Sequence, residues 1–162
     1  MKVVFLDIDG VLNCNSTTNR VLGYDFVDDD KVDSLKHIID ETGAKVVLSS
    51  TWREGWYDFD NGRAETISAD LFVALERRLL ESGIEMIDKT PMFRGHLSVR
   101  GQEIKHWIEH CDEDIEAFVI LEDWESLAPY NDDNIVWTDD YDGLTDQDAE
   151  AAIKILNRVL TK

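Results

Sequence analysis

Apolar and polar residues alternate along the chain in two different periods, which predicts strands and helices in turn. Short apolar runs rich in β-branched residues favour buried strands, at residues 3–6, 45–49, 84–88, 117–121 and 134–137. Apolar side chains recur at helical spacing in the segments between them, at residues 29–42, 69–82 and 100–111, and again after Thr145. This order is typical of βαβ units. We therefore expect an α/β protein, a Rossmann-like three-layer α/β/α sandwich around a mostly parallel five-stranded sheet.

The ends of two predicted helices have clear signals. Gly43 follows the first helix, at a position where glycine commonly ends a helix. Thr145-Asp146-Gln147-Asp148 approximates a capping box, with Asp148 in place of the usual Glu, and begins the last helix. That helix is expected to bury one apolar stripe against the sheet: Ala149, Ala152, Ile153, Leu156 and Leu160.

Length and composition favour a single domain over residues 1–162. Hydrophobic residues make up 43% of the 162, which is enough for a sizeable core. Residues 11–28 leave room for a short flap and residues 53–68 for a modest loop insertion. No stretch approaches the ~20 apolar residues of a transmembrane helix, and the N-terminal apolar run ends at Asp7, too early for a signal peptide. We expect a cytoplasmic protein with no membrane partner.

The formal charge is strongly negative. A net charge of −19 disfavours general attraction to a nucleic-acid backbone, so no general nucleic-acid-binding surface is expected. The two cysteines, Cys14 and Cys111, lie far apart in sequence and fit neither a disulfide framework nor a zinc site. Basic residues gather in the central third of the chain, where they would suit an anionic substrate: Arg53, Arg63, Arg77, Arg78, Arg94, His96 and Arg100. Arg77 and Arg78, in the middle of a predicted helix, are instead expected to be solvated surface residues.

Two carboxylates follow the first predicted strand. Asp7 ends the apolar run, Asp9 comes two positions later, and Gly10 allows a sharp turn beyond them. Ligands of open α/β sheets bind at the carboxyl ends of the strands. A carboxylate pair at that place can bind a hard cation, or can divide the roles of nucleophile and general acid/base.

The segment Asp-Ile-Asp-Gly-Val-Leu-Asn, residues 7–13, resembles the first motif of the haloacid dehalogenase (HAD) superfamily, whose Mg²⁺-dependent phosphatases form an aspartyl-phosphate. The resemblance implies that Asp7 is the nucleophile and that Asp9 is the general acid/base. It also implies that the Asp7 carboxylate and the Asp9 backbone carbonyl are Mg²⁺ ligands.

Residues 46–53, Val-Val-Leu-Ser-Ser-Thr-Trp-Arg, resemble the second motif, in which a hydroxyl after a strand binds a phosphoryl oxygen. Ser50 is the expected contact and Ser49 the competing assignment. Arg53 lies about one helical turn further on, where it either binds the phosphate through its guanidinium or lies exposed on the surface. Together with Gly10 and Thr51, Ser49 and Arg53 are candidate substrate-binding residues.

The two remaining motifs of the superfamily have counterparts that depart from its pattern. Arg100-Gly101 stands where a Lys-Gly is usual, so Arg100 is the expected cation of the third motif, with Lys89 as its rival. Glu122-Asp123 resembles the acidic fourth motif, with Glu in the place of the first Asp. Asp123 is the first choice as a Mg²⁺ ligand, and Glu122 is the alternative.

The resemblance implies a phosphatase with a minimal or absent cap, close to small superfamily members associated with RNA repair proteins. Its expected substrate is a phosphorylated small molecule or a nucleic-acid end, and its oligomeric state is left open. A cluster of aromatic residues either packs within the protein, as such clusters more often do, or stacks a base beside the site: Trp52, Trp56, Tyr57 and Phe59. The alternatives are a non-catalytic metal-binding regulatory module, a phosphotransferase, or a carbon–halogen hydrolase, which would not need Asp9.

Overall fold

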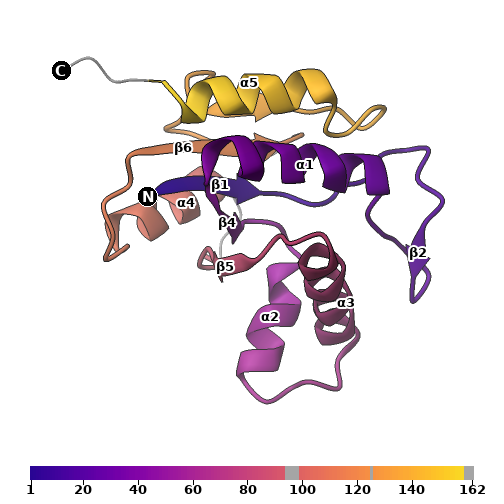
Figure 1. Ribbon diagram of the computed structural model, residues 1–162. Helices are drawn as coiled ribbons and strands as arrows, with labels where there is room; N and C mark the ends of the chain where they lie inside the picture. The colour runs from indigo at the N-terminus through magenta and orange to yellow at the C-terminus, as the bar shows by residue number, and fades with distance from the viewer. Residues whose placement is uncertain (94–98, 125, 159–162) are drawn as a thin grey trace.

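A computed structural model describes residues 1–93, 99–124 and 126–158. Its main sheet has five parallel strands in the order β5-β4-β1-β6-β7, which confirms the predicted α/β architecture (Figure 1). The strands are β1 (Lys2–Leu6), β4 (Lys45–Leu48), β5 (Met86–Lys89), β6 (Ala117–Glu122) and β7 (Ile135–Trp137). A separate antiparallel hairpin, β2 (Arg20–Val21) and β3 (Tyr24–Asp25), lies within the predicted flap.

Five helices lie in the described part of the chain: α1 (Asp29–Thr42), α2 (Arg53–Asp60), α3 (Ile67–Glu81), α4 (Arg100–Glu109) and α5 (Asp146–Leu156). The capping box of α5 is present, with Thr145 and Asp148 bonded reciprocally. Gly43 follows α1 with a left-handed backbone (φ 67°), the conformation that glycine adopts without strain. Leu160 lies outside the described residues.

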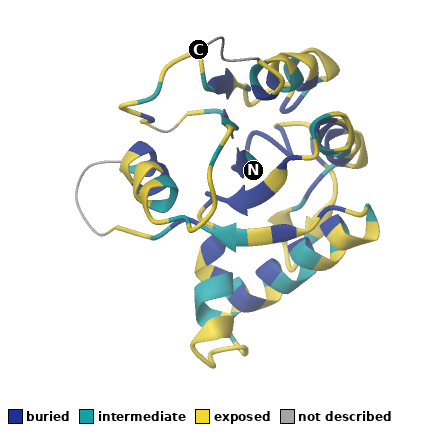
Figure 2. Cartoon of the chain, turned by 60° about the vertical axis from the view of Figure 1, so that its left-hand side comes forward, coloured by how far each residue is buried: buried dark blue, intermediate teal, exposed yellow. Residues whose placement is uncertain are grey.

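The central strand β1 is buried on both faces. Val4 and Leu6 belong to a core formed with α1, α3 and α5, whereas Val3 and Phe5 belong to a second core under α4. Side chains of a strand alternate between its two faces, so a continuous apolar run is what a strand between two helical layers requires. Figure 2 shows the strands largely buried and the helices exposed on their outer sides.

The structure differs from the sequence-based prediction between residues 53 and 68. Residues 53–60 form the helix α2 where a loop was expected, and α3 begins at Ile67. Packing explains the helix, because Trp56 stacks on Phe72 of α3 with ring centroids 5.0 Å apart. Gly55 allows the close approach, since a Cβ there would lie 1.8 Å from the Ser68 carbonyl oxygen. A helix of 8 residues is too short to show a clear period of apolar residues, and its stability depends on the contact with another segment, so the sequence pattern did not predict it.

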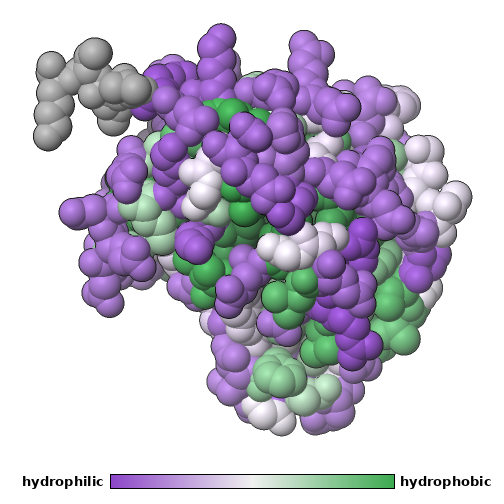
Figure 3. Space-filling view, viewed as in Figure 1, coloured by the Kyte–Doolittle hydropathy of each residue, from purple (hydrophilic) through white to green (hydrophobic). Residues whose placement is uncertain are grey.

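Smaller differences concern element ends. The predicted strand at 84–88 is observed at Met86–Lys89, and α4 ends at Glu109, so that Cys111 follows the helix and is half-buried. The face in Figure 3 is mostly hydrophilic over α5 and α1, with more hydrophobic residues toward α3 and the hairpin. Within the described residues, the helices are too short or too polar to cross a membrane.

Candidate active site

Strand register brings three predicted motifs together. Leu6 of β1 pairs with Leu48 of β4 on one side and with Leu121 of β6 on the other. Asp7 and Ser49, which directly follow their strands, therefore lie at the same level as Glu122, the last residue of β6. Backbone bonds extend the pairing by one residue, because the Asp7 amide donates to the Leu121 carbonyl (3.1 Å) and the Ser49 amide to the Leu6 carbonyl (2.9 Å). Parallel pairing thus fixes the predicted nucleophile between the second and fourth motifs.

Arg100 faces Asp7 from the first turn of α4. Its Nη1 lies 3.6 Å from Asp7 Oδ1 and donates to Glu122 Oε2 at 2.9 Å. The side chains of Arg100, Asp7 and Glu122 are all buried or nearly so. The two positions at which the chain departs from the superfamily pattern, Arg100 and Glu122, are therefore in direct contact. A guanidinium in this place can neutralise a carboxylate and bind an anionic oxygen at the same time.

Three carboxylates converge beside this guanidinium. One oxygen each of Asp7, Glu122 and Asp123 lies within 4.8 Å of the others. Burial and the neighbouring Asp7 raise the pKa of Glu122 to about 9, and Arg100 opposes that shift. Burial also raises the pKa of Asp123 to about 6, helped by the nearby Asp140 and Asp7. Crowded, partly buried carboxylates of this kind are stabilised in their ionised form by an added cation.

The donor set of this cluster fits Mg²⁺. All three groups offer carboxylate oxygens, the ligands that this hard cation prefers, and the adjoining cavity leaves space for the waters that it retains. Gly10 packs against the cluster, since a Cβ at this position would lie 2.1 Å from Asp123 Oδ2. Its left-handed backbone (φ 78°) also suits glycine. Gly10 thus makes room for the carboxylate of Asp123.

Asp9 is exposed and held by two donors. Asn13 Nδ2 donates to Asp9 Oδ1 at 3.0 Å, and the Trp52 indole Nε1 donates to Asp9 Oδ2 at 3.1 Å. Asn13 Oδ1 in turn accepts from the Gly10 amide at 2.9 Å. These bonds fix the carboxylate at the entrance of the site rather than inside the acidic cluster, a position suited to proton exchange with a leaving group or a water molecule.

The hydroxyl residues after β4 have different surroundings. Ser49 and Ser50 are fully buried. Ser50 Oγ accepts from the Trp52 amide at 3.3 Å, and Ser49 Oγ has no partner among the described residues. Thr51 is exposed and lines the cavity that Asp7 also lines. The loop therefore brings Thr51 to the cavity wall, whereas both serines are buried.

Arg53 points into the protein rather than into the cavity. Its Nη1 donates to the carbonyls of Ser49 (2.6 Å) and Ser50 (2.7 Å), and its Nη2 pairs with Glu103 Oε2 at 2.5 Å. The side chain is only 3% exposed. The expected grip on the phosphate has no support in this geometry. Arg53 instead fixes the backbone of the serine loop, and Glu103 of α4 holds Arg53.

Lys89, the rival cation of the third motif, lies elsewhere. Its Nζ pairs with Asp60 at 2.6 Å and lies 4.5 Å from the ring centroids of both Trp56 and Tyr57. Arg100 is the cation that faces Asp7. Arg94 and His96, also part of the basic central third, lie outside the described residues.

Of the four aromatic residues that base stacking or packing would account for, one lies at the site. Trp52 bonds Asp9, whereas Trp56 stacks on Phe72 and the Tyr57 hydroxyl donates to the Thr90 carbonyl at 3.0 Å. Phe59, in the last turn of α2, is 51% exposed. Trp52 is therefore the only one of the four that the described contacts connect to a catalytic candidate.

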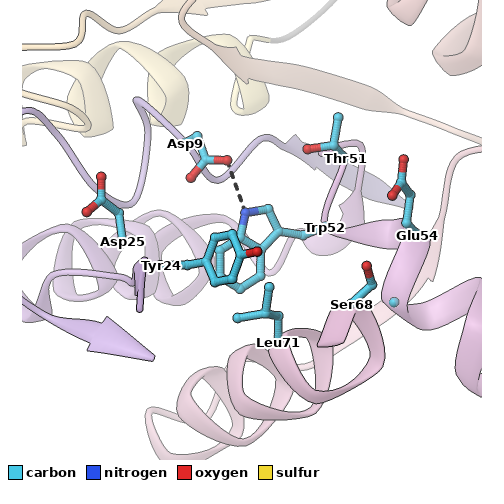
Figure 4. Close-up of a pocket in the computed structure, with 9 residues that line it drawn as sticks. Asp9, Tyr24, Asp25, Thr51, Trp52, Glu54, Ser68 and Leu71 are labelled. Atoms are coloured by element: carbon cyan, nitrogen blue, oxygen red, sulfur yellow. Dashed lines mark hydrogen bonds between the residues drawn. The ribbon is translucent and has the colours of Figure 1, made fainter. Parts of the chain in front are cut away.

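Two adjoining cavities surround the predicted nucleophile and acid/base. A cavity of about 370 Å³ is lined by Asp7, Asp9, Thr51, Arg100, Glu122, Asp123, Trp124 and Asp140. A second, of about 330 Å³, shares Asp9 and Thr51 with it and extends between the hairpin, α2 and α3 (Figure 4). The site thus adjoins a side cavity beside the hairpin, and Asp9 and Thr51 line both.

Sequence reasoning missed several residues that complete the site. Asn13 is the last residue of the first-motif segment. Its position three residues after Gly10 was the sequence signal that could have predicted its hydrogen bond with the Gly10 amide. Thr138, after β7, donates to the Gly10 carbonyl at 2.7 Å and so supports the first-motif turn. Glu103 and the 81% exposed Trp124 had no sequence signal, because their roles depend on contacts between distant segments.

The fold and the site together define a class of protein. A parallel Rossmann-like sheet, a carboxylate pair after its central strand, a cationic side chain that faces the first of these carboxylates and an acidic pair at the end of the neighbouring strand are the arrangement of a HAD-type domain. Residues 3–149 match the family described as "HAD domain in Swiss Army Knife RNA repair proteins", and the chain belongs to that family. HAD domains are in general hydrolases of the phosphatase kind and use Mg²⁺. A search of curated proteins finds no match.

Proposed function

We propose that the protein is a Mg²⁺-dependent phosphatase that hydrolyses phosphoric monoesters through an aspartyl-phosphate on Asp7. The main support is the position of Asp7, which faces Arg100 at 3.6 Å in a cavity that Asp9 and Asp123 also line. A nucleophilic carboxylate, a fixed positive charge and a second carboxylate at the entrance are the groups that this reaction needs.

The reaction uses the two aspartates of the first motif in two steps. In the first, an Asp7 oxygen attacks phosphorus in line, the bond from phosphorus to the leaving oxygen breaks, and Asp9 donates a proton to that oxygen. In the second, Asp9 takes a proton from a water molecule, which attacks phosphorus and releases phosphate and free Asp7. Arg100 neutralises Asp7 and the phosphoryl oxygens throughout.

The acidic cluster supplies the cation site. Asp7 and Asp123, with Glu122 as an alternative or additional ligand and the Asp9 carbonyl as a further oxygen, would hold Mg²⁺. When bound, Mg²⁺ supplies positive charge next to the phosphoryl group. Glu122 keeps Arg100 in place in either case, through the 2.9 Å bond.

Phosphoryl oxygens need further donors beside Arg100. Thr51 lines the cavity and Ser50 remains the expected hydroxyl of the second motif. Arg53 contributes by holding the carbonyls of Ser49 and Ser50, which directs the amide groups of this loop. We therefore assign phosphate binding to the loop over residues 49–51 and a supporting role to Arg53.

The test is phosphate release with and without Mg²⁺ from an aryl phosphate, sugar phosphates, nucleoside monophosphates and phosphorylated oligonucleotides. Asp7→Asn is expected to lower turnover by at least about three orders of magnitude without unfolding the protein. Asp33→Asn, the same change at an exposed position of α1, should retain full activity. Full activity of Asp7→Asn would remove Asp7 as the nucleophile.

The covalent intermediate has its own readout. Asp9→Asn removes both the acid of the first step and the base that activates water in the second. With the aryl phosphate, whose leaving group needs no proton, the first step should continue, so the phosphorylated enzyme should accumulate and appear in intact-mass spectra of acid-quenched samples. Mg²⁺ binding without phosphate release from any compound would instead support a regulatory module. Transfer of the phosphoryl group to an added alcohol in preference to water would support a phosphotransferase.

A further inference from the structure

The side cavity beside Asp9 takes no part in the two steps at phosphorus. It is lined by the loop after β1, the β2–β3 hairpin, the start of α2 and the first turn of α3 (Figure 4). We infer that this cavity receives the leaving alcohol of the substrate, and that this alcohol is a nucleoside without a second phosphate. The inference rests on the proposed phosphatase function and names the substrate class of the same site.

The position of Asp9 gives the direction of the leaving group. The general acid must contact the leaving oxygen, and Asp9 is the carboxylate that lines both cavities. Its Oδ2 accepts from the indole of Trp52, which is itself a wall of the side cavity (Figure 4). An alcohol whose oxygen lies at Asp9 therefore extends along Trp52 into the side cavity, while its phosphoryl group remains between Asp7 and Arg100.

The apolar walls of the side cavity suit a flat ring. Tyr24 on β3 is 52% exposed, although tyrosine has a large apolar face. Trp52 is half-buried. It packs against Phe26, with ring centroids 6.3 Å apart, and also lines the cavity. Leu71 of α3 adds an aliphatic side chain. Stacking on aromatic side chains favours every nucleic-acid base, because each base has a π-face.

The polar groups of the cavity suit sugar hydroxyls and disfavour a further anion. Thr51 and Ser68 offer hydroxyls, and the charged residues that line the cavity are all acidic: Asp9, Asp25 and Glu54. Asp25 is paired with Arg20, whereas Glu54 has no ion-pair partner among the described residues. None of the residues that line the cavity is a lysine or arginine that could neutralise a second phosphate beside Glu54. For two unit charges about 6 Å apart, at an effective dielectric between those of protein and water, the repulsion corresponds to roughly tenfold weaker binding.

The cavity therefore favours a mononucleotide over a polynucleotide end. At a nucleic-acid end the leaving group continues into a phosphodiester, whose charge would approach the carboxylate of Glu54. A nucleoside presents only a base and hydroxyls. Its base can contact Tyr24 and Trp52, and its hydroxyls can bond Thr51, Ser68 and Glu54.

The first experiment measures kcat/KM in the presence of Mg²⁺ for five compounds: a nucleoside 5′-monophosphate, a nucleoside 3′-monophosphate, ribose 5-phosphate, a terminally phosphorylated dinucleotide and phosphocholine. One of the mononucleotides should exceed ribose 5-phosphate by about tenfold or more, which is the effect of stacking one base. It should exceed the dinucleotide by a similar factor. Equal or better hydrolysis of ribose 5-phosphate, the dinucleotide or phosphocholine would overturn the inference.

Two variants test the walls separately, each with a matched control. Tyr24→Ala should lower the ratio of mononucleotide to ribose 5-phosphate by about tenfold, whereas Tyr141→Ala, at a 79% exposed tyrosine outside both cavities, should leave it unchanged. Glu54→Lys should raise the ratio of dinucleotide to mononucleotide by about tenfold, and Glu85→Lys, at an exposed position before β5, should not. Unchanged ratios in Tyr24→Ala and Glu54→Lys would refute the assignment of the cavity.

Binding separates this inference from the proposed function. Asp7→Asn should bind a mononucleotide about tenfold more tightly than ribose 5-phosphate in isothermal titration calorimetry with Mg²⁺ present, whether or not the wild type turns either over. If the aryl phosphate and ribose 5-phosphate are hydrolysed while binding shows no preference, the nucleoside assignment fails and the phosphatase stands. If nothing is hydrolysed but the binding preference is present, the phosphatase function fails and the nucleoside assignment of the cavity stands.

Discussion

Glu103→Gln tests the buried network behind the site. Glu103 Oε2 pairs with Arg53 at 2.5 Å, Glu103 Oε1 accepts from the Phe93 amide at 2.8 Å, and both charged side chains are at most 6% exposed. Two unit charges about 4 Å apart interact by about 4 kcal/mol at an effective dielectric of about 20. Glutamine keeps the shape and an oxygen acceptor, which returns about 1 kcal/mol. We expect the free energy of unfolding to fall by about 3 kcal/mol, in line with broken buried pairs in general.

The assay is urea denaturation followed by tryptophan fluorescence. The control is Glu109→Gln, the same substitution on the same helix, where Glu109 pairs with Lys105 at 3.7 Å and both side chains are about half exposed. An exposed helical pair contributes only about 0.5 kcal/mol. A loss below about 1 kcal/mol in Glu103→Gln would refute the reasoning, because Arg53 would then not depend on Glu103 for its burial.

Three further predictions concern the cation site and the surface. Gly10→Ala places a Cβ 2.1 Å from Asp123 Oδ2, on a backbone of φ 78°, and so displaces the Asp123 carboxylate. The Mg²⁺ concentration for half-maximal activity should therefore rise by about tenfold or more. An unchanged value would show that Asp123 is not a ligand. Because the pKa values of Asp123 and Glu122 are raised from their ordinary values of 3.8 and 4.5 to about 6 and about 9, the metal-free fold loses stability as the pH rises from about 4 to about 9, and Mg²⁺ opposes the loss. The increase in Tm caused by Mg²⁺ should therefore be larger at pH 8.5 than at pH 5.5. Equal increases would contradict the raised pKa values of Asp123 and Glu122. The hydrogen bond to Glu150 raises the pKa of His37 above 6.5, so their contact stabilises the fold below that pH and the contribution disappears as the pH rises through the raised pKa. NMR titration should show the pKa of His37 falling in Glu150→Gln, and no change would exclude the bond in solution.

The main features of the fold followed from local patterns. The apolar run before Asp7, the stop at Gly43 and the capping box at Thr145 are each contained in a few consecutive residues, and each is observed. The helix α2 was missed because its stability depends on the stack of Trp56 on Phe72, a partner from another helix. Local periodicity cannot report such a contact.

Candidate residues at strand ends were easier to place than those on helices and loops. Asp7 and Glu122 directly follow paired positions of β1 and β6, so parallel register alone brings them together. Arg53 was expected to face the phosphate because it lies near Ser50 in sequence. Its guanidinium instead turns toward Glu103, 50 residues away, because a buried charge needs a partner.

The sequence by itself determined the α/β architecture, the family, and the edge of the sheet at which the acidic and hydroxyl residues gather. These depend on periodicity, chain order and parallel pairing. Only the tertiary structure decided that Arg100 rather than Lys89 faces Asp7, that Trp52 holds Asp9, and that Tyr24 closes a side cavity beside it. The reason is that the direction of a side chain and its partner depend on how separate helices and loops pack. The residues next to it in the sequence do not show which distant residues it will contact.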